Sequence, residues 1–243
     1  MPQRLWPSAD TTRIPFWVYT DPEIYKREQE RIFGASFWSY VALSTEIPRA
    51  GDFKRSYIGD KSVVVIRDHD GSPRVVANRC AHRGLAFCTE SFGKAKEIMC
   101  PYHQWTYDLC GNLKAVPLRR GLRQQGGMPE DFRLDEHGLQ KLAVVERNGV
   151  VFASFGEPLP FEEELGATML NYFDRVFDGR ALRVLGYLRQ RIQGNWKLMF
   201  ENIKDPYHAS LLHVFLVTFG LFRADQPSEV RMDASGRHAC LIS

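Results

Sequence analysis

The sequence has no long hydrophobic run and no extended basic block. Its most apolar window, residues 211–222, contains His213 and is too short to cross a bilayer as a helix. The net charge is only +3 and no basic block is longer than Arg119-Arg120. The sequence therefore lacks the basic patch that is typical of nucleic-acid-binding proteins. Residues 1–20 lack the apolar core of a secretory signal. We therefore expect a cytoplasmic protein that binds neither nucleic acid nor a membrane.

Cysteine and histidine are also scarce. The five cysteines, in a chain without an export signal, argue against a disulfide framework and favour metal binding or burial. There are seven histidines, and four of them fall in two short motifs. This concentration predicts that the two motifs carry metal chemistry.

Short β-rich runs separated by turn signals begin near Phe37. Residues 63–66, between Asp60 and Asp70-Gly71, have the composition of a hairpin strand. Residues 144–145 and 150–155, around Asn148-Gly149, predict another hairpin. We expect a small antiparallel β domain over residues 37–156.

The flanking segments have helical patterns. Residues 21–34 predict a helix capped by Asp21, and residues 161–177 predict one with three glutamates in its first turn. Residues 195–215 have helical periodicity interrupted by Pro206, whereas residues 182–192 suit a strand.

These patterns together predict an α+β chain in three parts. They are an N-terminal helical arm (1–36), the antiparallel β domain (37–156) and the start of a helix-plus-antiparallel-sheet domain (157–243).

Two segments within the β domain each supply one cysteine and one histidine, seventeen residues apart: Cys80, His82, Cys100 and His103. Structural zinc sites use the same ligand types, but zinc fingers usually pair Cys with Cys and His with His. In a Rieske centre one iron is bound by two thiolates and the other by two imidazoles. Each loop therefore supplies one ligand to each iron. The arrangement favours a Rieske [2Fe-2S] cluster over zinc or over burial without a metal.

The segments NRCAHRG and CPYHQWTYDLCGNL resemble the cluster loops of Rieske oxygenase large subunits. Gln104 stands where much of that family has glycine, beside a ligand rather than at one. The resemblance implies that Trp105 packs beside the cluster and that Gly84 and Gly111 let the loops turn tightly. The remaining cysteines do not fit the two-plus-two pattern and are expected to be structural: Cys88, Cys110 and Cys240.

The second motif contains Asp205, His208 and His213. A five-residue step on a regular helix turns about 140°, so the two imidazoles would share a face only if the helix were distorted, for example by Pro206. Two histidines and one carboxylate, with open positions, form the facial triad of non-haem Fe(II) oxygenases. Two core histidines on an amphipathic helix are the alternative.

This motif resembles the mononuclear-iron motif of the same family. The resemblance implies that His208 and His213 bind Fe(II) and that Asp205 bridges His208 to a cluster histidine, equivalent to His103, across a subunit boundary. Asn202 and Tyr207, and less so Glu201, are expected to support the ligands.

The third iron ligand of the family is an aspartate farther downstream than Ser243. The acids after His213 lie in no matching context: Asp225, Glu229 and Asp233. We therefore interpret residues 157–243 as the N-terminal part of a mononuclear-iron catalytic domain, ending before that domain does in the family.

Several segments are most similar to the salicylate 5-hydroxylase and anthranilate dioxygenase group, among them VPLRRG, GVVFASF and ENIKDPYHASLLHVFLVTFGLFRADQ. This similarity implies hydroxylation of a carboxylated, salicylate-like ring with O2, by mono- or dioxygenation. Residues 216–222 could line an apolar pocket or form ordinary core.

The family resemblance also implies partners. These are a ferredoxin with its NAD(P)H-dependent reductase, a small beta subunit, and an alpha3beta3 or alpha3 assembly. Two other functions are open: a Rieske-type electron-transfer protein without oxygenase chemistry, and a zinc-stabilised binding module.

Overall fold

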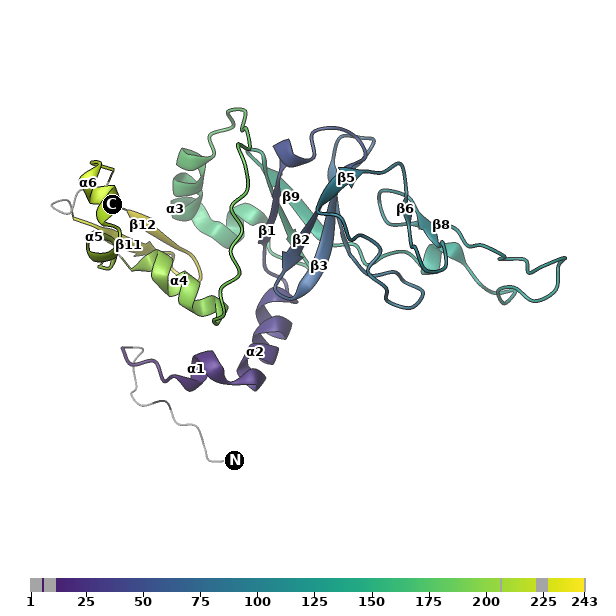
Figure 1. Cartoon of the computed structure of the whole chain (residues 1–243), viewed down its shortest axis with the longest axis horizontal. Coiled ribbons are helices and arrows are strands. Elements are labelled where there is room, and N and C mark those ends of the chain that lie inside the picture. The colour runs from purple at the N-terminus through teal and green to yellow at the C-terminus, as the bar shows by residue number, and fades with distance from the viewer. Residues whose placement is uncertain (1–5, 7–11, 206, 222–226, 243) are drawn as a thin grey trace. The chain divides into compact units, whose positions relative to one another are not determined.

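The computed structural model describes residues 6, 12–205, 207–221 and 227–242 (Figure 1). The chain divides into two compact units. The first comprises residues 1–28, 162–176 and 188–243, and the second comprises residues 29–161 and 177–187. Within the described ranges, no helix has the length and apolar character needed to cross a membrane.

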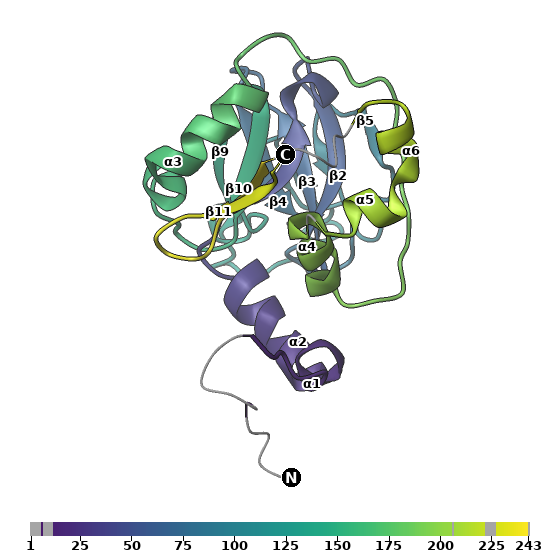
Figure 2. The same cartoon turned by 90° about the vertical axis from the view of Figure 1, so that its left-hand side faces the viewer.

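The second unit is built on two antiparallel sheets. One has the strand order β4-β3-β2-β5, whose strands are labelled in Figure 2, and the other has the order β1-β10-β9. Their strands are β1 (Ser39–Leu43), β2 (Asp52–Ile58), β3 (Lys61–Arg67), β4 (Pro73–Ala77), β5 (Phe92–Lys94), β9 (Ala143–Arg147) and β10 (Val150–Ser154). The expected β2–β3 and β9–β10 hairpins are confirmed.

Strand β3 is buried on both faces because its apolar residues are consecutive. Successive side chains of a strand point to opposite faces. Val63 and Val65 accordingly join the core that β1 and β10 complete, while Val64 and Ile66 join a second core. That second core contains Cys80 and Cys100, so one strand supports both the first core and the loops that carry these two cysteines.

A small third sheet carries the second cysteine-histidine segment. Its order is β6-β7-β8, formed by β6 (Ile98–Met99), β7 (Thr106–Tyr107) and β8 (Leu113–Ala115). The turn between β6 and β7 holds Cys100 and His103. The short 3-10 helices of this unit are η2 (Ser44–Glu46) and η3 (Leu134–Glu136).

The first unit is mainly helical, with one hairpin. It contains α1 (Trp17–Thr20), α2 (Pro22–Glu28), α3 (Phe161–Val176), α4 (Trp196–Lys204), α5 (Ala209–Leu212), α6 (Val214–Thr218), β11 (Glu229–Met232) and β12 (Ala239–Ile242). Helix α2 continues into a π-helical turn, η1 (Gln29–Phe33), before Gly34. The α+β class and the helices at 21–34 and 161–177 are thus confirmed.

Two expectations need correction. Residues 182–192 are not a strand: no described strand pairs with them, and Leu185 and Leu188 are exposed. The expected helix over 195–215 is three helices, because the backbone leaves helical geometry after Lys204 and again at His213, where φ is −101° and ψ is 49°. Pro206, the expected cause of a distortion, lies outside the described residues.

Candidate metal centres

The first loop, after β4, is closed by side chain to backbone hydrogen bonds. The Asn78 amide donates to the carbonyl of Cys88 at 2.8 Å and accepts from the Cys88 amide at 2.9 Å. Inside this clamp Gly84 adopts φ +73° and donates to the carbonyl of Cys80 at 2.9 Å. Glycine tolerates that conformation, so the loop turns tightly and holds Cys80 and His82 at its start.

The second loop is a tight turn closed on itself. Cys100 donates from its amide to the carbonyl of Trp105, and Gln104 donates to the carbonyl of Cys100, both at 2.9 Å. Gln104 has φ +56°, which few residues other than glycine adopt readily. The conformation explains why glycine suits this position.

The two loops bring the expected cluster ligands together in two pairs, His82 with His103 and Cys80 with Cys100. The His82 and His103 ring centroids are 4.6 Å apart. Cys80 and Cys100 are 3% and 2% exposed and both are free thiols. Burial raises the pKa of the Cys100 thiol, and the adjacent Cys80 thiol raises it further.

The donor set fits a two-iron cluster. The buried His82 Nδ1 has no hydrogen-bond partner, as expected of a nitrogen reserved for a metal. Burial and the neighbouring His103 lower the pKa of His82, which favours the neutral, metal-binding imidazole. Among the described residues no three His, Cys, Asp or Glu side chains are grouped to hold one ion. Two protein ligands per iron are all that a Rieske cluster requires.

Aromatic side chains surround these ligands. Trp105 is buried and stacks on His82 with ring centroids 4.7 Å apart and planes 5° apart, as expected for a residue beside the cluster. Tyr107 was not anticipated: its fully buried hydroxyl lies 3.2 Å from Cys80 Sγ and accepts from the Ala81 amide. Its position on β7, two residues after Trp105 and on the same face, is the signal that could have revealed it.

The second motif lies where α5 and α6 meet. His208 precedes α5 and His213 separates α5 from α6, so both leave regular helical geometry. Their ring centroids are 5.2 Å apart. His208 Nδ1 donates to Asp205 Oδ2 at 3.1 Å, which leaves Nε2 for a metal. Hydrogen bonds from the Tyr207 amide and from His208 lower the pKa of the Asp205 carboxyl.

The neighbouring acidic candidates that the structure describes each have another partner. Glu201 accepts from the Tyr19 hydroxyl at 2.5 Å, which raises the pKa of Tyr19 to about 12. Glu229 pairs with Arg231 at 2.7 Å, and Asp233 accepts from the His238 amide at 2.9 Å. Asp225 lies outside the described residues. Two imidazoles therefore fit a mononuclear iron, and among the described residues no carboxylate is grouped with both of them.

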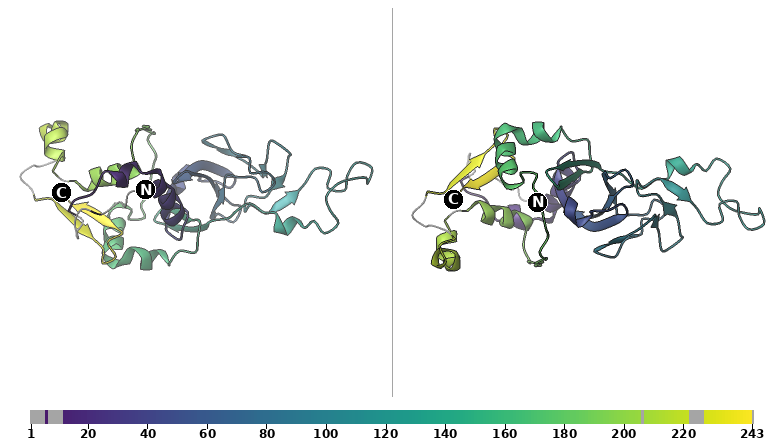
Figure 3. Two further views of the ribbon diagram at one scale, coloured as in Figure 1. Left: turned by 90° about the horizontal axis from the view of Figure 1, so that it is seen from below. Right: turned by 90° about the horizontal axis from the view of Figure 1, so that it is seen from above.

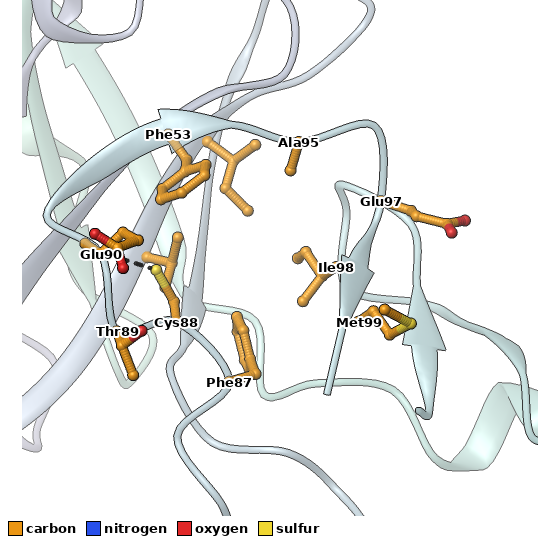
Figure 4. A pocket seen from close by; sticks show the side chains of 11 residues that line it. Phe53, Phe87, Cys88, Thr89, Glu90, Ala95, Glu97, Ile98 and Met99 are labelled. Carbon is orange, nitrogen blue, oxygen red and sulfur yellow. Dashed lines mark hydrogen bonds between the residues drawn. The ribbon is translucent and has the colours of Figure 1, made fainter. Parts of the chain in front are cut away.

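The other cysteines lie away from the ligand set. Cys110 donates to Asp68 at 3.0 Å, and Cys240 lies on β12. Cys88 lines an apolar hollow of about 200 Å³ between Phe53, Phe87 and Ile98, where its thiol donates to the Glu90 carbonyl (Figure 4). Apolar side chains line most of this hollow, so it offers no ligand set of its own.

Comparison with known proteins agrees with this geometry. Residues 37–126 match the model of the Rieske [2Fe-2S] domain. The chain contains a Rieske domain. That domain is the kind that carries a [2Fe-2S] cluster, and the match spans both cluster loops.

Relatives extend the similarity beyond the Rieske domain. The chain is 60% identical to the large oxygenase component of salicylate 5-hydroxylase from Ralstonia sp., over 98% of this chain and 57% of that protein. It is 46% identical to the anthranilate 1,2-dioxygenase large subunit of Burkholderia cepacia, over 97% of this chain and 56% of that subunit. The chain thus spans little more than half the length of these relatives.

A solved structure extends the likeness to the fold. Naphthalene 1,2-dioxygenase from Rhodococcus sp., bound to indole, superposes with a TM-score of 0.75 at 32% identity, covering 87% of this chain and 48% of that one. The likeness to Rieske oxygenase large subunits therefore includes residues after the Rieske domain.

Proposed function

We propose that this chain is the large subunit of a Rieske-type terminal oxygenase that hydroxylates a carboxylated, salicylate-like aromatic ring with O2. Cys80, His82, Cys100 and His103 hold the [2Fe-2S] cluster. His208 and His213 bind a mononuclear Fe(II). The approach of the His82 and His103 rings, with a buried His82 Nδ1 that has no hydrogen-bond partner, is the observation that carries the proposal.

The metals supply one-electron transfer at the cluster and a site for O2 chemistry at the mononuclear iron. The protein's own contribution is orientation. Asp205 accepts from His208 Nδ1, which fixes the tautomer and aims Nε2 outward. Trp105 holds the His82 ring in one plane by stacking. These contacts support assigning Asp205 to electron delivery, with Asn202, Tyr207 and Glu201 in supporting positions.

The substrate and partners follow from the relatives. The 60% identical relative is named a salicylate 5-hydroxylase component and the 46% identical one an anthranilate dioxygenase subunit, and both names specify carboxylated rings. We extend to this chain a ferredoxin, its NAD(P)H-dependent reductase, a small beta subunit and an alpha3 or alpha3beta3 assembly. The division into an arm (1–36), Rieske domain (37–156) and catalytic part (157–243) stays a prediction.

Metal analysis and EPR spectroscopy test the cluster. We expect iron with acid-labile sulfide and, on reduction, the low average g-value of a histidine-ligated cluster. Iron and sulfide without additional iron would favour the alternative, an electron-transfer protein without oxygenase chemistry. A zinc-loaded, colourless protein would overturn both.

Turnover tests the mononuclear site and the substrate. His208→Ala or His213→Ala should abolish hydroxylation of salicylate while the visible spectrum of the cluster is unchanged, because the ligand sets are separate. His69→Ala, which changes an exposed-loop histidine outside both sets, is the matched control. Normal turnover by either ligand variant would remove that histidine from the site, and a preference for naphthalene over salicylate would refute the carboxylated-ring assignment.

A further inference from the structure

A stripe of charged side chains runs along one face of α4 (Trp196–Lys204) and its C-cap residue. Its members are Lys197, Glu201 and Asp205, which recur every four residues. Residues four apart lie on the same face of a helix, one turn after the other. Asp205 ends the stripe and accepts the hydrogen bond from His208 Nδ1. The rotation of α4 about its own axis therefore sets the direction of this carboxylate.

The first two members of the stripe contact the N-terminal helices α1 and α2. Glu28 Oε1 accepts from Lys197 Nζ at 2.5 Å, and the Tyr19 hydroxyl donates to Glu201 Oε1 at 2.5 Å. Lys197 Nζ also lies 5.8 Å from the centre of the Tyr19 ring. In Figure 3 the purple segment of α1 and α2 passes beside the green segment that contains α4. Two successive turns of α4 are thus tied to the N-terminal helices.

Further contacts fix the beginning of α4. Glu28 Oε2 accepts from Trp196 Nε1 at 2.8 Å. The Asn195 side chain donates to the Tyr19 carbonyl at 3.0 Å and caps the helix by accepting from the Lys197 amide at 3.1 Å. The side chains of Glu28 and Lys197 are only 11% and 17% exposed. A partly buried ion pair is screened by salt much less than an exposed one, so this contact holds α4 at ordinary ionic strength.

Apolar packing does not fix α4 in the same way. No residue of this helix, which the structure describes completely, is buried. The apolar side chains of Leu198, Phe200 and Ile203 are exposed. The polar contacts with Tyr19 and Glu28 are therefore the specific contacts that set the rotation of α4.

We propose that Tyr19 and Glu28 are positioning residues for the mononuclear iron site. They fix the rotation of α4, and thereby the direction from which the Asp205 carboxylate meets His208. Neither residue belongs to a metal-binding motif, and neither touches a proposed ligand. This inference rests on the proposed function, because it requires that His208 binds iron.

The hydrogen bond between Asp205 and His208 makes the effect measurable at the metal. A carboxylate that accepts from the second nitrogen of a ligating imidazole fixes the orientation of the ring and raises its basicity. If α4 rotates, both ligands remain but the orientation of the His208 ring changes. The alternative is that Tyr19 and Glu28 only stabilise the N-terminal helices, in which case the iron environment is unaffected.

EPR spectroscopy of nitric oxide bound to the mononuclear Fe(II) tests the positioning directly, because the rhombicity of this signal depends on ligand geometry. In the oxygenase holoenzyme, Tyr19→Phe and Glu28→Lys should keep the wild-type iron content and cluster spectrum but shift the nitric oxide signal. Glu23→Lys makes the same charge change at an exposed residue of α2 and should leave the signal unchanged.

Turnover and a charge exchange supply the second measurement. Tyr19→Phe and Glu28→Lys should lower kcat about tenfold, because a small displacement at the reacting centre is costly, while KM for the aromatic substrate stays near the wild-type value. Glu28→Lys/Lys197→Glu restores the ion pair with its charges exchanged. This double variant should recover most of kcat and the wild-type nitric oxide signal.

The outcomes separate this inference from the proposed function. A wild-type holoenzyme without mononuclear iron overturns both. With the iron present, a wild-type nitric oxide signal and kcat in Tyr19→Phe and Glu28→Lys overturn the inference alone, even if Tm falls, since the contacts would then only stabilise the N-terminal helices. A raised KM with unchanged kcat also overturns it, because the contacts would then serve substrate binding.

Discussion

Residues that contact the proposed ligands affect the properties of the cluster site, in addition to the ligands themselves. Tyr107 and Trp105 follow Cys100 within seven residues, and both are buried against a ligand. Burial and the Cys80 thiol raise the pKa of the Tyr107 hydroxyl, so the group stays protonated at ordinary pH and remains a donor. Hydrogen bonds to the sulfurs are among the determinants of the potential of an iron–sulfur cluster.

Tyr107→Phe should therefore lower the reduction potential of the cluster. When the cluster holds Cys80 as a thiolate, only the Tyr107 hydroxyl can donate across their 3.2 Å contact, and this bond would be stronger when reduction adds negative charge to the cluster. A hydrogen bond worth about 1 kcal/mol corresponds to a shift of roughly 40 mV for one electron. Spectroelectrochemistry measures it, with Tyr57→Phe on the exposed end of β2 as the control. An unchanged potential would mean that the hydroxyl does not donate to the sulfur.

At the scale of elements, a buried ion pair joins β2 to η2 and to the segment 177–187. Lys54 Nζ lies 2.7 Å from Glu46 Oε2, and the Tyr187 hydroxyl donates to Glu46 Oε1 at 2.6 Å. The Glu46 side chain is 2% exposed. Burial alone would raise the pKa of Glu46, but the bonds from Lys54 and Tyr187 outweigh burial and hold the pKa below its usual value.

Removing one partner of this pair should be costly. Lys54→Met leaves the Glu46 carboxylate buried without its cation and should lower the free energy of unfolding by about 3 kcal/mol. Lys114→Met, at an exposed lysine of β8, should change it little. Chemical denaturation measures the free energy of unfolding of both variants. Equal values for Lys54→Met and the wild type would show that the ion pair does not stabilise the fold.

The same pair predicts a dependence of stability on pH. Because the folded pKa of Glu46 is depressed, its contribution to stability is complete above the usual glutamate pKa of 4.5 and is lost as the pH falls through the folded pKa. Thermal unfolding from pH 7 to pH 3 should therefore show a smaller loss of Tm in Glu46→Gln than in the wild type. Parallel curves for the two proteins would contradict this assignment.

At the scale of the whole molecule, the two units differ in how well they bury apolar surface. The second unit encloses two cores. In the first unit, large apolar side chains of α4–α6 are between 49% and 75% exposed: Leu198, Phe200, Leu211, Leu212 and Phe215. Exposed apolar patches of this kind promote association.

The 243-residue chain should therefore self-associate at micromolar concentration. Leu212→Lys/Phe215→Lys should shift it toward monomer and reduce binding of a hydrophobic dye. Leu185→Lys/Leu188→Lys changes two leucines that are also exposed but lie outside α4–α6, and it should have a smaller effect. Sedimentation velocity measures the outcome, and a monomeric wild type would contradict the prediction.

The sequence alone determined the two hairpins and the α+β class, because these depend on local patterns. The mixed Cys/His segments predicted a Rieske [2Fe-2S] cluster, and the match to the Rieske domain agrees with this. Only tertiary structure decided what surrounds the ligands. The contacts of Tyr107 with Cys80 and of Trp105 with His82 join different loops. Tertiary structure also decided that residues 182–192 do not form a strand. A strand requires a neighbouring strand to pair with, and local composition cannot supply one.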